Sequence, residues 1–153
     1  MLSAFPDLRP YLDPERVLFL PGSPDKRQAL LTIGERLCRH PHIPDRAAYL
    51  KAIFDREYVT STGIGGGVAV PHAQLPDIVD FVLALGLCPD GIDFAAKDAK
   101  PVRVIVMIAA PTDNRPAYLK TLASVAARLN RPSALQAMLA AQDGAGAIAA
   151  FLA

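Results

Sequence analysis

Apolar runs alternate with polar segments marked by proline in the first third of the chain. The run Val17–Leu20 is closed by a Pro-Gly pair, which predicts a short strand. Ser23 then predicts the N-cap of a helix that has Pro24 at its first position. The buried stripe of that helix follows at helical spacing: Leu30, Ile33 and Leu37. Pro44 and Asp45 open a second helix, whose stripe is Tyr49, Ala52 and Ile53.

Two later runs, Val79–Cys88 and Val102–Ala110, are rich in Val, Ile and Leu on both faces. Strands that are buried on both faces have this composition, which predicts helices packed on each side of a sheet. After Pro111 the helical period returns, and one face is predicted to hold Leu119, Leu122, Ala126 and Leu129.

Two short Ala-rich helices are expected at the end of the chain, over residues 133–141 and 143–153. Gly144 and Gly146 are expected to weaken the start of the second of them by about 1 kcal/mol each relative to Ala. The whole pattern predicts one α/β domain over residues 1–153, with a mixed β-sheet sandwiched between helices.

Composition narrows the class of protein. Of 153 residues, 52% are apolar and 20% are charged, which excludes a disordered chain. The 16 basic and 15 acidic side chains give a net charge of +1, without the basic excess of a nucleic-acid-binding protein. Two cysteines fifty positions apart indicate neither a disulfide framework nor a metal site, and favour a reducing cytoplasm.

The apolar runs are too short for a membrane protein. The longest, residues 81–88, falls well below the roughly 18 residues of a membrane helix. The segment Met1–Pro10 has no apolar signal core. We therefore expect no membrane insertion, no secretion signal and a cytoplasmic location.

The segment from Arg56 to His72 departs from the core-building pattern. It holds four glycines in five positions, 63–67, which bring backbone N–H groups close to a ligand or allow positive φ angles. Val68–Val70 then predicts a minimal strand, and Pro71 is expected to end its hydrogen-bonded ladder. His72 would thus stand at a strand end on a stiff backbone, where active-site residues are often found.

A histidine in this position suits phosphoryl transfer. Its ordinary pKa of about 6.5 leaves the imidazole mostly neutral at pH 7, with one nitrogen free as a nucleophile. Arg56, the glycine N–H groups and the hydroxyls of Ser61 and Thr62 could balance the charge of a phosphoryl group on His72. The segment lacks the Gly-Lys-Ser/Thr ending of a Walker loop, and its glycines precede the strand, unlike those of a dinucleotide fingerprint.

The same segment resembles the signature of type-2 enzyme IIA domains. The shared run is Arg56-Glu57, Ser61-Thr62-Gly63-Ile64-Gly65 and Gly67-Val68-Ala69-Val70-Pro71-His72. These domains belong to the bacterial phosphoenolpyruvate-dependent phosphotransferase system, in its fructose, mannitol and nitrogen-regulatory branch. The resemblance covers nearly the whole chain and implies the same helix-covered mixed sheet.

The resemblance also implies a function and its residues. His72 would accept phosphate from a histidine phosphocarrier protein, with Arg56 and Thr62 beside it. It would pass the phosphate to a cysteine of a IIB component or hold it as a regulatory mark, with no metal, no cofactor and no nucleic acid involved. Ile64, Leu75 and Pro76 are candidates for the docking patch, and a homodimer stays open.

One position departs from the family pattern. Where the family usually has a second histidine, this chain has Tyr118. A tyrosine can donate a hydrogen bond to a phosphoryl oxygen but carries no positive charge. This substitution favours an alternative of another class, a regulatory protein-binding module with or without phosphorylation; a third alternative is a small-molecule-binding α/β domain without phosphotransfer.

Each candidate residue also has a purely structural interpretation. Arg56 could be a charge that complements the helix dipole, Thr62 could bond local backbone, and Tyr118 could be a packed aromatic. His40 and His42 are expected in a solvated loop, because two histidines without a third ligand are weak evidence for a metal. Cys88 is interpreted as a buried strand residue followed by a plain turn at Asp90-Gly91, and Met107 as strand core.

Overall fold

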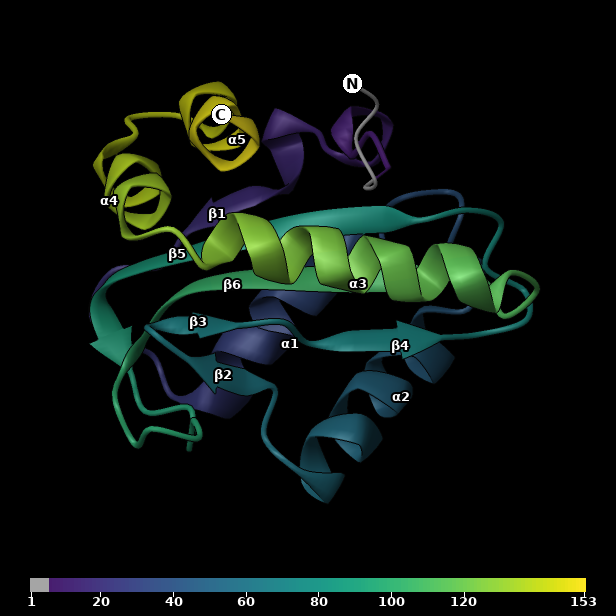
Figure 1. Ribbon diagram of the computed structural model, residues 1–153. Helices are drawn as coiled ribbons and strands as arrows, with labels where there is room; N and C mark the ends of the chain where they lie inside the picture. The colour runs from purple at the N-terminus through teal and green to yellow at the C-terminus, as the bar shows by residue number, and fades with distance from the viewer. Residues whose placement is uncertain (1–5) are drawn as a thin grey trace.

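A computed structural model describes residues 6–153 of the chain as a six-stranded sheet between two layers of helices (Figure 1). The expectation for Met1–Pro10 therefore lies partly outside the described residues. The strands are β1 (Val17–Phe19), β2 (Gly63–Gly65), β3 (Val68–Ala69), β4 (His72–Gln74), β5 (Val82–Ile92) and β6 (Val102–Ala110). The α-helices are α1 (Lys26–Leu37), α2 (Arg46–Val59), α3 (Arg115–Leu129), α4 (Pro132–Ala140) and α5 (Gly144–Leu152), and two 3-10 turns, η1 (Arg9–Tyr11) and η2 (Pro14–Arg16), precede β1.

The sheet is mixed, as predicted. Its strand order is β1-β5-β6-β3-β2, and β4 also pairs with β6, in line with β3. β5 and β6 are antiparallel, whereas β1 runs parallel to β5, and β3 and β4 run parallel to β6. The long central pair therefore carries the interrupted strand β3–β4, which holds the candidate site, along one side.

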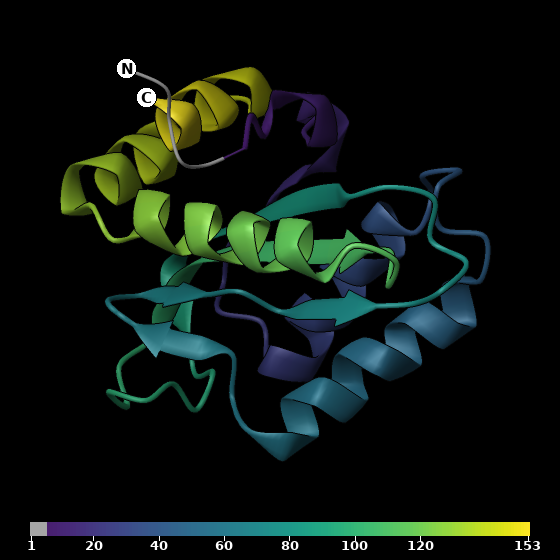
Figure 2. The same ribbon diagram turned by 45° about the vertical axis from the view of Figure 1, so that its right-hand side comes forward.

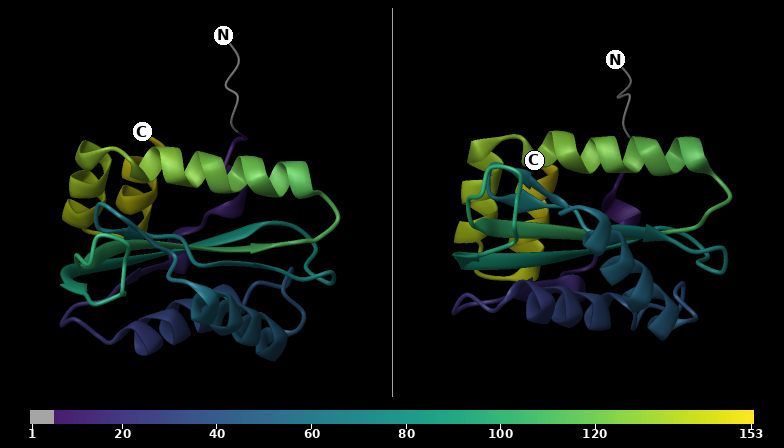
Figure 3. Two further views of the ribbon diagram at one scale, coloured as in Figure 1. Left: turned by 60° about the horizontal axis from the view of Figure 1, so that its bottom comes forward. Right: turned by 90° about the horizontal axis from the view of Figure 1, so that it is seen from below.

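Two apolar cores fill the spaces on the two faces of the sheet. α1 and α2 cover one face, and α3 with α4 and α5 covers the other, as Figures 2 and 3 show. Successive residues of β6 alternate between the cores: Ile105 and Met107 face α1 and α2, while Val104 and Val106 face the other layer. All four side chains are buried, which confirms the prediction of a strand with two covered faces.

The start of the first helix differs from the prediction. Asp25, not Ser23, is the N-cap of α1: its side chain accepts a hydrogen bond from the Gln28 N–H. Ser23 has a φ of 50° and its hydroxyl donates to the Asp90 carbonyl, so it belongs to the turn after β1. The second helix opens at Asp45, in agreement with the prediction, and Asp45 caps α2 by accepting from the Ala48 N–H.

The bounds of the first long strand were also wrong. Val79 is 67% exposed and precedes β5, because the strand begins only at Val82. At its other end β5 runs through Pro89 and Asp90, and its register against β6 shifts between Leu87 and Ile92. The irregular pairing accommodates the proline, so the predicted plain turn is part of a bulged strand.

The predicted apolar face of α3 is wrong at its first position. Leu119 is 48% exposed, and Tyr118, Thr121 and Val125 face the core instead. The buried face of α3 includes the polar residues Thr121 and Ser124, so the spacing of apolar residues alone does not identify it. No helix within residues 6–153 has the length and apolar character needed to cross a bilayer.

Candidate functional site

His72 is positioned by a break in the edge of the sheet. The ladder with β6 is interrupted after Ala69 and resumes at His72, which pairs with Ile108. Across the break, the Val70 N–H donates to the Thr62 carbonyl, and the Pro71 carbonyl accepts from the Ile108 N–H. His72 thus begins a second short strand, β4, where we had expected the ladder to end, and its side chain is half-buried.

The backbone beside His72 selects one form of the imidazole. His72 Nδ1 lies 2.6 Å from the Val70 carbonyl oxygen. A carbonyl oxygen can only accept, so Nδ1 carries the hydrogen and donates. In the neutral ring, Nε2 then keeps a free lone pair, which is the property that a nucleophile needs.

The surroundings of His72 favour that neutral form. Burial lowers the pKa of His72, and the positive charge of Arg56 lowers it further. The hydrogen bond to Val70 and the charge of Glu57 act in the opposite direction, but the pKa stays below its ordinary value. The imidazole is therefore mostly unprotonated at pH 7, and available as a nucleophile.

Arg56 and His72 line the same pocket, which has a volume of about 230 Å³. Arg56 stands in the last turn of α2, and its Nη1 donates to the Thr60 carbonyl at 3.0 Å. Lys97, from the segment after β5, adds a second cation to the lining. The other lining residues are Thr60, Ser61, Thr62, Ile64, Val70, Leu122 and Ala126. Two cations beside a neutral imidazole form a suitable environment for an anionic group.

Thr62 lies in the pocket wall with its polar groups already occupied. Its N–H and hydroxyl donate to the two carboxylate oxygens of Glu57, at 2.9 Å and 2.7 Å. Glu57 is also paired with Lys26, at 2.8 Å. The hydroxyl of Thr62 therefore bonds the Glu57 side chain and not the local backbone of the structural interpretation, and it holds the segment to the end of α2.

Tyr118 lies beside His72, at the first turn of α3. The centroids of the two rings are 6.1 Å apart, with their planes inclined by 57°. Tyr118 is 8% exposed, and burial raises the pKa of its hydroxyl, so the side chain is neutral at physiological pH. It adds a hydroxyl and an aromatic surface to the neighbourhood of His72, but no charge.

The glycine-rich turn has only one of the two roles considered for it, that of allowing positive φ angles. Gly65, Gly66 and Gly67 all have positive φ angles, as predicted, and form the tight connection between β2 and β3. None of the three lines the pocket of His72, and the Gly66 N–H donates to the Asp98 carboxylate. The positive charge near His72 therefore comes from side chains, Arg56 and Lys97, and not from this turn.

Lys97 and Glu57 were missed as members of the site. Lys97 is twenty-five residues beyond His72 in the sequence, within a segment that carries no motif. It reaches the site because its N–H donates to the Gly63 carbonyl, a pairing that sequence periodicity does not show. Glu57 was visible next to Arg56, but its role as the bonding partner of Thr62 depends on the fold.

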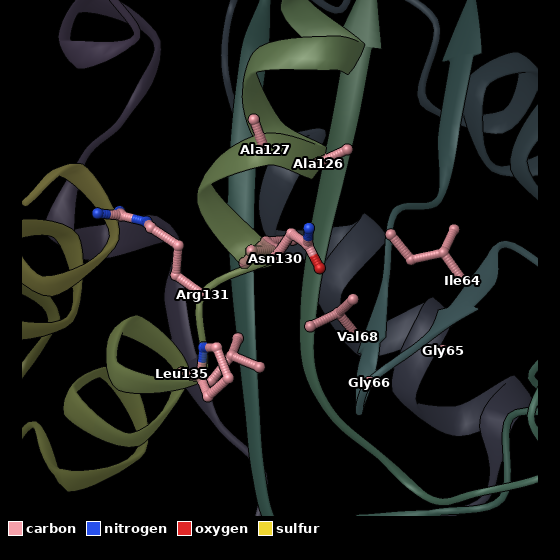
Figure 4. A pocket seen from close by; sticks show the side chains of 11 residues that line it. Ile64, Gly65, Gly66, Val68, Ala126, Ala127, Asn130, Arg131 and Leu135 are labelled. Carbon is pink, nitrogen blue, oxygen red and sulfur yellow. The ribbon is translucent and has the colours of Figure 1, made fainter.

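A larger hollow of about 500 Å³ adjoins the pocket, with which it shares Ile64 and Ala126. Figure 4 shows it between the β2–β3 turn and the end of α3, with the Asn130 amide directed into the space. Its walls are mainly apolar, with Arg131 as the charged residue of the lining, so it extends the surface beside His72.

The other two histidines form a separate pair. His40 and His42 are half-buried with ring centroids 4.4 Å apart, so the loop is less solvated than expected. Within residues 6–153 no group of three or more His, Cys, Asp or Glu side chains is arranged to hold a metal ion. Cys88 and Met107 are fully buried strand residues, as predicted.

Comparison with known sequences identifies relatives over most of the chain. The family described as "Phosphoenolpyruvate-dependent sugar phosphotransferase system, EIIA 2" matches residues 10–153. The nitrogen regulatory protein of Bradyrhizobium diazoefficiens is 31% identical over 92% of this chain and 90% of its own length, and that of Escherichia coli is 34% identical over 77% and 72%. The fructose-specific EIIABC component of Bacillus subtilis is 36% identical over 65% of this chain, which spans only 16% of that protein.

Solved structures show the same fold. IIA-Ntr from Neisseria meningitidis has a TM-score of 0.84 at 24% identity, covering 93% of this chain and 97% of its own. IIA mannitol from Escherichia coli has a TM-score of 0.73 at 22% identity, covering 92% and 98%. The complex of enzyme IIAMtl with phosphorylated enzyme IIBMtl from Escherichia coli gives a TM-score of 0.75 at 20% identity, covering 92% and 96%.

Proposed function

The chain belongs to the EIIA 2 family of the phosphoenolpyruvate-dependent sugar phosphotransferase system, and we propose that it is a phosphohistidine carrier with Nε2 of His72 as the acceptor atom. The observation that carries this proposal is the 2.6 Å contact of Nδ1 with the Val70 carbonyl. It leaves the lone pair on Nε2, in a pocket whose cations are Arg56 and Lys97.

The reaction is a displacement at phosphorus. The Nε2 lone pair of His72 attacks the phosphorus of a phosphorylated donor protein, the Nε2–P bond forms, and the bond to the donor's nitrogen breaks. Nδ1 keeps its hydrogen and its bond to Val70, so the phosphorylated ring needs no change of tautomer. Arg56 and Lys97 balance the charge on the phosphoryl oxygens by electrostatic attraction. Solvent screens part of this attraction, because Arg56 is partly exposed and Lys97 is exposed.

The donor and the acceptor are inferred from the family. We take the donor to be a histidine phosphocarrier protein, and the acceptor to be a cysteine of a IIB component, since a relative of the same fold forms a complex with phosphorylated IIB. The docking surface includes Ile64, which is 43% exposed at the pocket. Tyr58 and Val59, at the end of α2 next to Arg56, are 91% and 78% exposed and extend it. Leu75 packs partly against the core, so it contributes less than expected.

The first prediction tests the acceptor residue. The protein is incubated with phosphoenolpyruvate, enzyme I and a histidine phosphocarrier protein, and acid-labile phosphate is mapped by mass spectrometry. We expect one phosphate on His72, its loss in His72→Gln, and full labelling of the matched control His40→Gln. Label on His40 or His42, or undiminished labelling of His72→Gln, would contradict the assignment.

A second function, regulation by protein binding, is supported by relatives that are named as nitrogen regulatory proteins. The relatives of Bradyrhizobium and Escherichia coli that match 92% and 77% of this chain are both nitrogen regulatory proteins. The two functions differ in the fate of the phosphoryl group. Transfer of the label from His72 to the cysteine of a IIB component of the same organism supports the transport function. A label that stays on His72 with every such IIB component supports the regulatory function.

A further inference from the structure

A second pocket lies between η2 and the end of α1, at the edge of the sheet that β1 forms, opposite to the edge of His72. Its volume is about 380 Å³, within the range of sites for small molecules. Its lining is dominated by groups that can be cationic: Arg16, Arg36, Arg39 and His40, with Glu15 and Pro41. This concentration of positive charge is unusual in a chain whose net charge is +1.

The arginines of this pocket have no carboxylate partner within the described part of the chain. Arg16 donates to the carbonyls of Leu83 and Tyr11, and Arg36 donates to the carbonyl of Glu15 at 2.7 Å. The ion pairs found within residues 6–153 involve Arg9, Lys26, Arg46 and Lys51, and none involves an arginine of this pocket. Burial lowers the pKa of Arg16, and the charges of Asp13 and Glu15 act in the opposite direction without restoring it to its ordinary value.

His40 adds a ring N–H donor to the residues that line this pocket. Its Nδ1 accepts the N–H of His42 at 3.0 Å, so the proton of the neutral ring is on Nε2. Burial lowers the pKa of His40, and the charges of His42 and Arg16 lower it further, while Asp13 raises it. An anion bound in the pocket would favour the charged ring and raise this pKa.

We propose that this pocket binds a small solute that carries a phosphate group. Guanidinium groups bind phosphate oxygens through pairs of parallel N–H donors, and three of them with one imidazole supply enough donors for a phosphate monoester. The volume of the pocket, about 380 Å³, suits a compact ligand and not a long polyanion such as nucleic acid.

This site is separate from that of His72. Arg16 contacts the Leu83 carbonyl of β5, Leu83 pairs with Ile108 of β6, and Ile108 pairs with His72 of β4. The two central strands therefore lie between the arginine pocket and the phosphoryl acceptor. A ligand in the arginine pocket cannot be the phosphoryl group on His72.

The test is a binding titration of the full chain in low salt, followed by NMR. The probe is fructose 6-phosphate, with fructose as the unphosphorylated match, and the signals are the ring C–H of His40 and the arginine Nε–H groups. We expect saturable binding of fructose 6-phosphate at millimolar concentration or below, a rise in the pKa of His40, and no response to fructose. Binding should persist in His72→Gln, which separates this result from the phosphocarrier function.

Three arginine variants decide whether this pocket is responsible for the binding of fructose 6-phosphate. Arg36→Gln and Arg39→Gln should each weaken binding about tenfold, as expected for the loss of one charged donor pair. Arg27→Gln makes the same charge change on an exposed residue in the first turn of α1, and should leave the affinity unchanged. Equal weakening by Arg27→Gln, or absence of the His40 response, would overturn the proposal. Tighter binding to a short DNA duplex or to phosphatidylglycerol vesicles than to fructose 6-phosphate would overturn it as well.

Discussion

Tyr118 lies where we expect part of the charge on a phosphorylated His72 to be balanced from the α3 side. Because the tyrosine is neutral, the phosphoryl group would meet only a hydroxyl and the N-terminus of α3 on that side. Near a surface, the attraction between an anion and a helix N-terminus contributes about 0.3–1 kcal/mol. Tyr118→His would add a positive charge at this position. We expect a higher yield and a longer lifetime of phosphohistidine in Tyr118→His, measured by acid-quenched labelling.

Tyr118→Phe is the control for that experiment. It keeps the packing against His72 and removes only the hydroxyl, so its phosphohistidine lifetime should equal or fall below that of the native chain. If Tyr118→His and Tyr118→Phe both behave like the native chain, Tyr118 is only a packed aromatic. The family's second histidine would then have no bearing on this site.

The lowered pKa of His72 predicts how stability depends on pH. In the unfolded chain His72 titrates near its ordinary pKa of about 6.5, whereas in the folded protein it titrates lower, because burial disfavours the charged ring. Above a pH of about 6.5, this difference in pKa makes its full contribution to the free energy of unfolding. This contribution is lost as the pH falls from there through the folded pKa.

Urea denaturation at a series of pH values measures this effect. The native chain should lose stability in mildly acidic buffer, and His72→Gln should lose less. His40 has a lowered pKa too, so His40→Gln should remove a further part of the slope. An identical pH profile for His72→Gln and the native chain would show that His72 titrates alike in the folded and unfolded chains.

Among elements, α5 shows where local propensity and tertiary packing disagree. Helix propensity alone predicts that Gly144→Ala would stabilise the chain. A Cβ on Gly144, however, would lie 2.6 Å from the carbonyl oxygen of Pro14 and 3.0 Å from its Cα, and backbone atoms cannot move aside easily. We therefore expect Gly144→Ala to lower the free energy of unfolding by about 1–3 kcal/mol.

Gly146 provides the comparison within the same helix. A Cβ there would meet side chains alone outside the helix backbone, and its nearest neighbour would be the Asp143 carboxylate at 3.1 Å. Gly146→Ala should therefore cost clearly less than Gly144→Ala in thermal or urea unfolding. Equal effects of the two substitutions would mean that η2 moves away from α5 without cost.

The same distinction explains which elements the sequence could predict. The strand cores, the two-faced burial of β6 and the opening of α2 at Asp45 follow from local patterns, and the structure confirms them. The cap at Ser23 and the start of β5 at Val79 were wrong because each depends on a distant partner: Ser23 bonds Asp90, and Val79 donates its N–H to the His42 carbonyl. The candidate site also depends on distant partners, since Lys97 reaches the pocket through its bond to the Gly63 carbonyl.

At the scale of the whole molecule, one buried polar network joins segments that are far apart in the chain. Lys26 of α1 pairs with Glu57 of α2, donates to the Phe94 carbonyl at 2.9 Å and lies over the Phe94 ring. Glu57 in turn accepts both hydrogen bonds of Thr62. The network therefore connects two helices, the segment after β5 and the backbone that leads to β2 and the site.

Removal of one partner should be costly because the other charge stays buried. Lys26→Met leaves the Glu57 carboxylate, whose side chain is 6% exposed, with Thr62 as its remaining partner, and we expect a loss of about 3 kcal/mol in the free energy of unfolding. The matched control is Lys51→Met, which breaks the exposed pair with Asp55 and should change stability by about 0.5 kcal/mol or less.

The double variant Lys26→Met with Glu57→Gln separates the pair from its surroundings. The substituted amide at position 57 is neutral, so the double variant should be more stable than the sum of the two single changes, by about 1–3 kcal/mol. Hydrogen exchange should also quicken in the β2–β3 hairpin of Lys26→Met, since Thr62 anchors that hairpin to Glu57. Additive effects, with unchanged exchange in the hairpin, would show that the packing of Phe94 against α1 holds this side of the molecule without the ion pair.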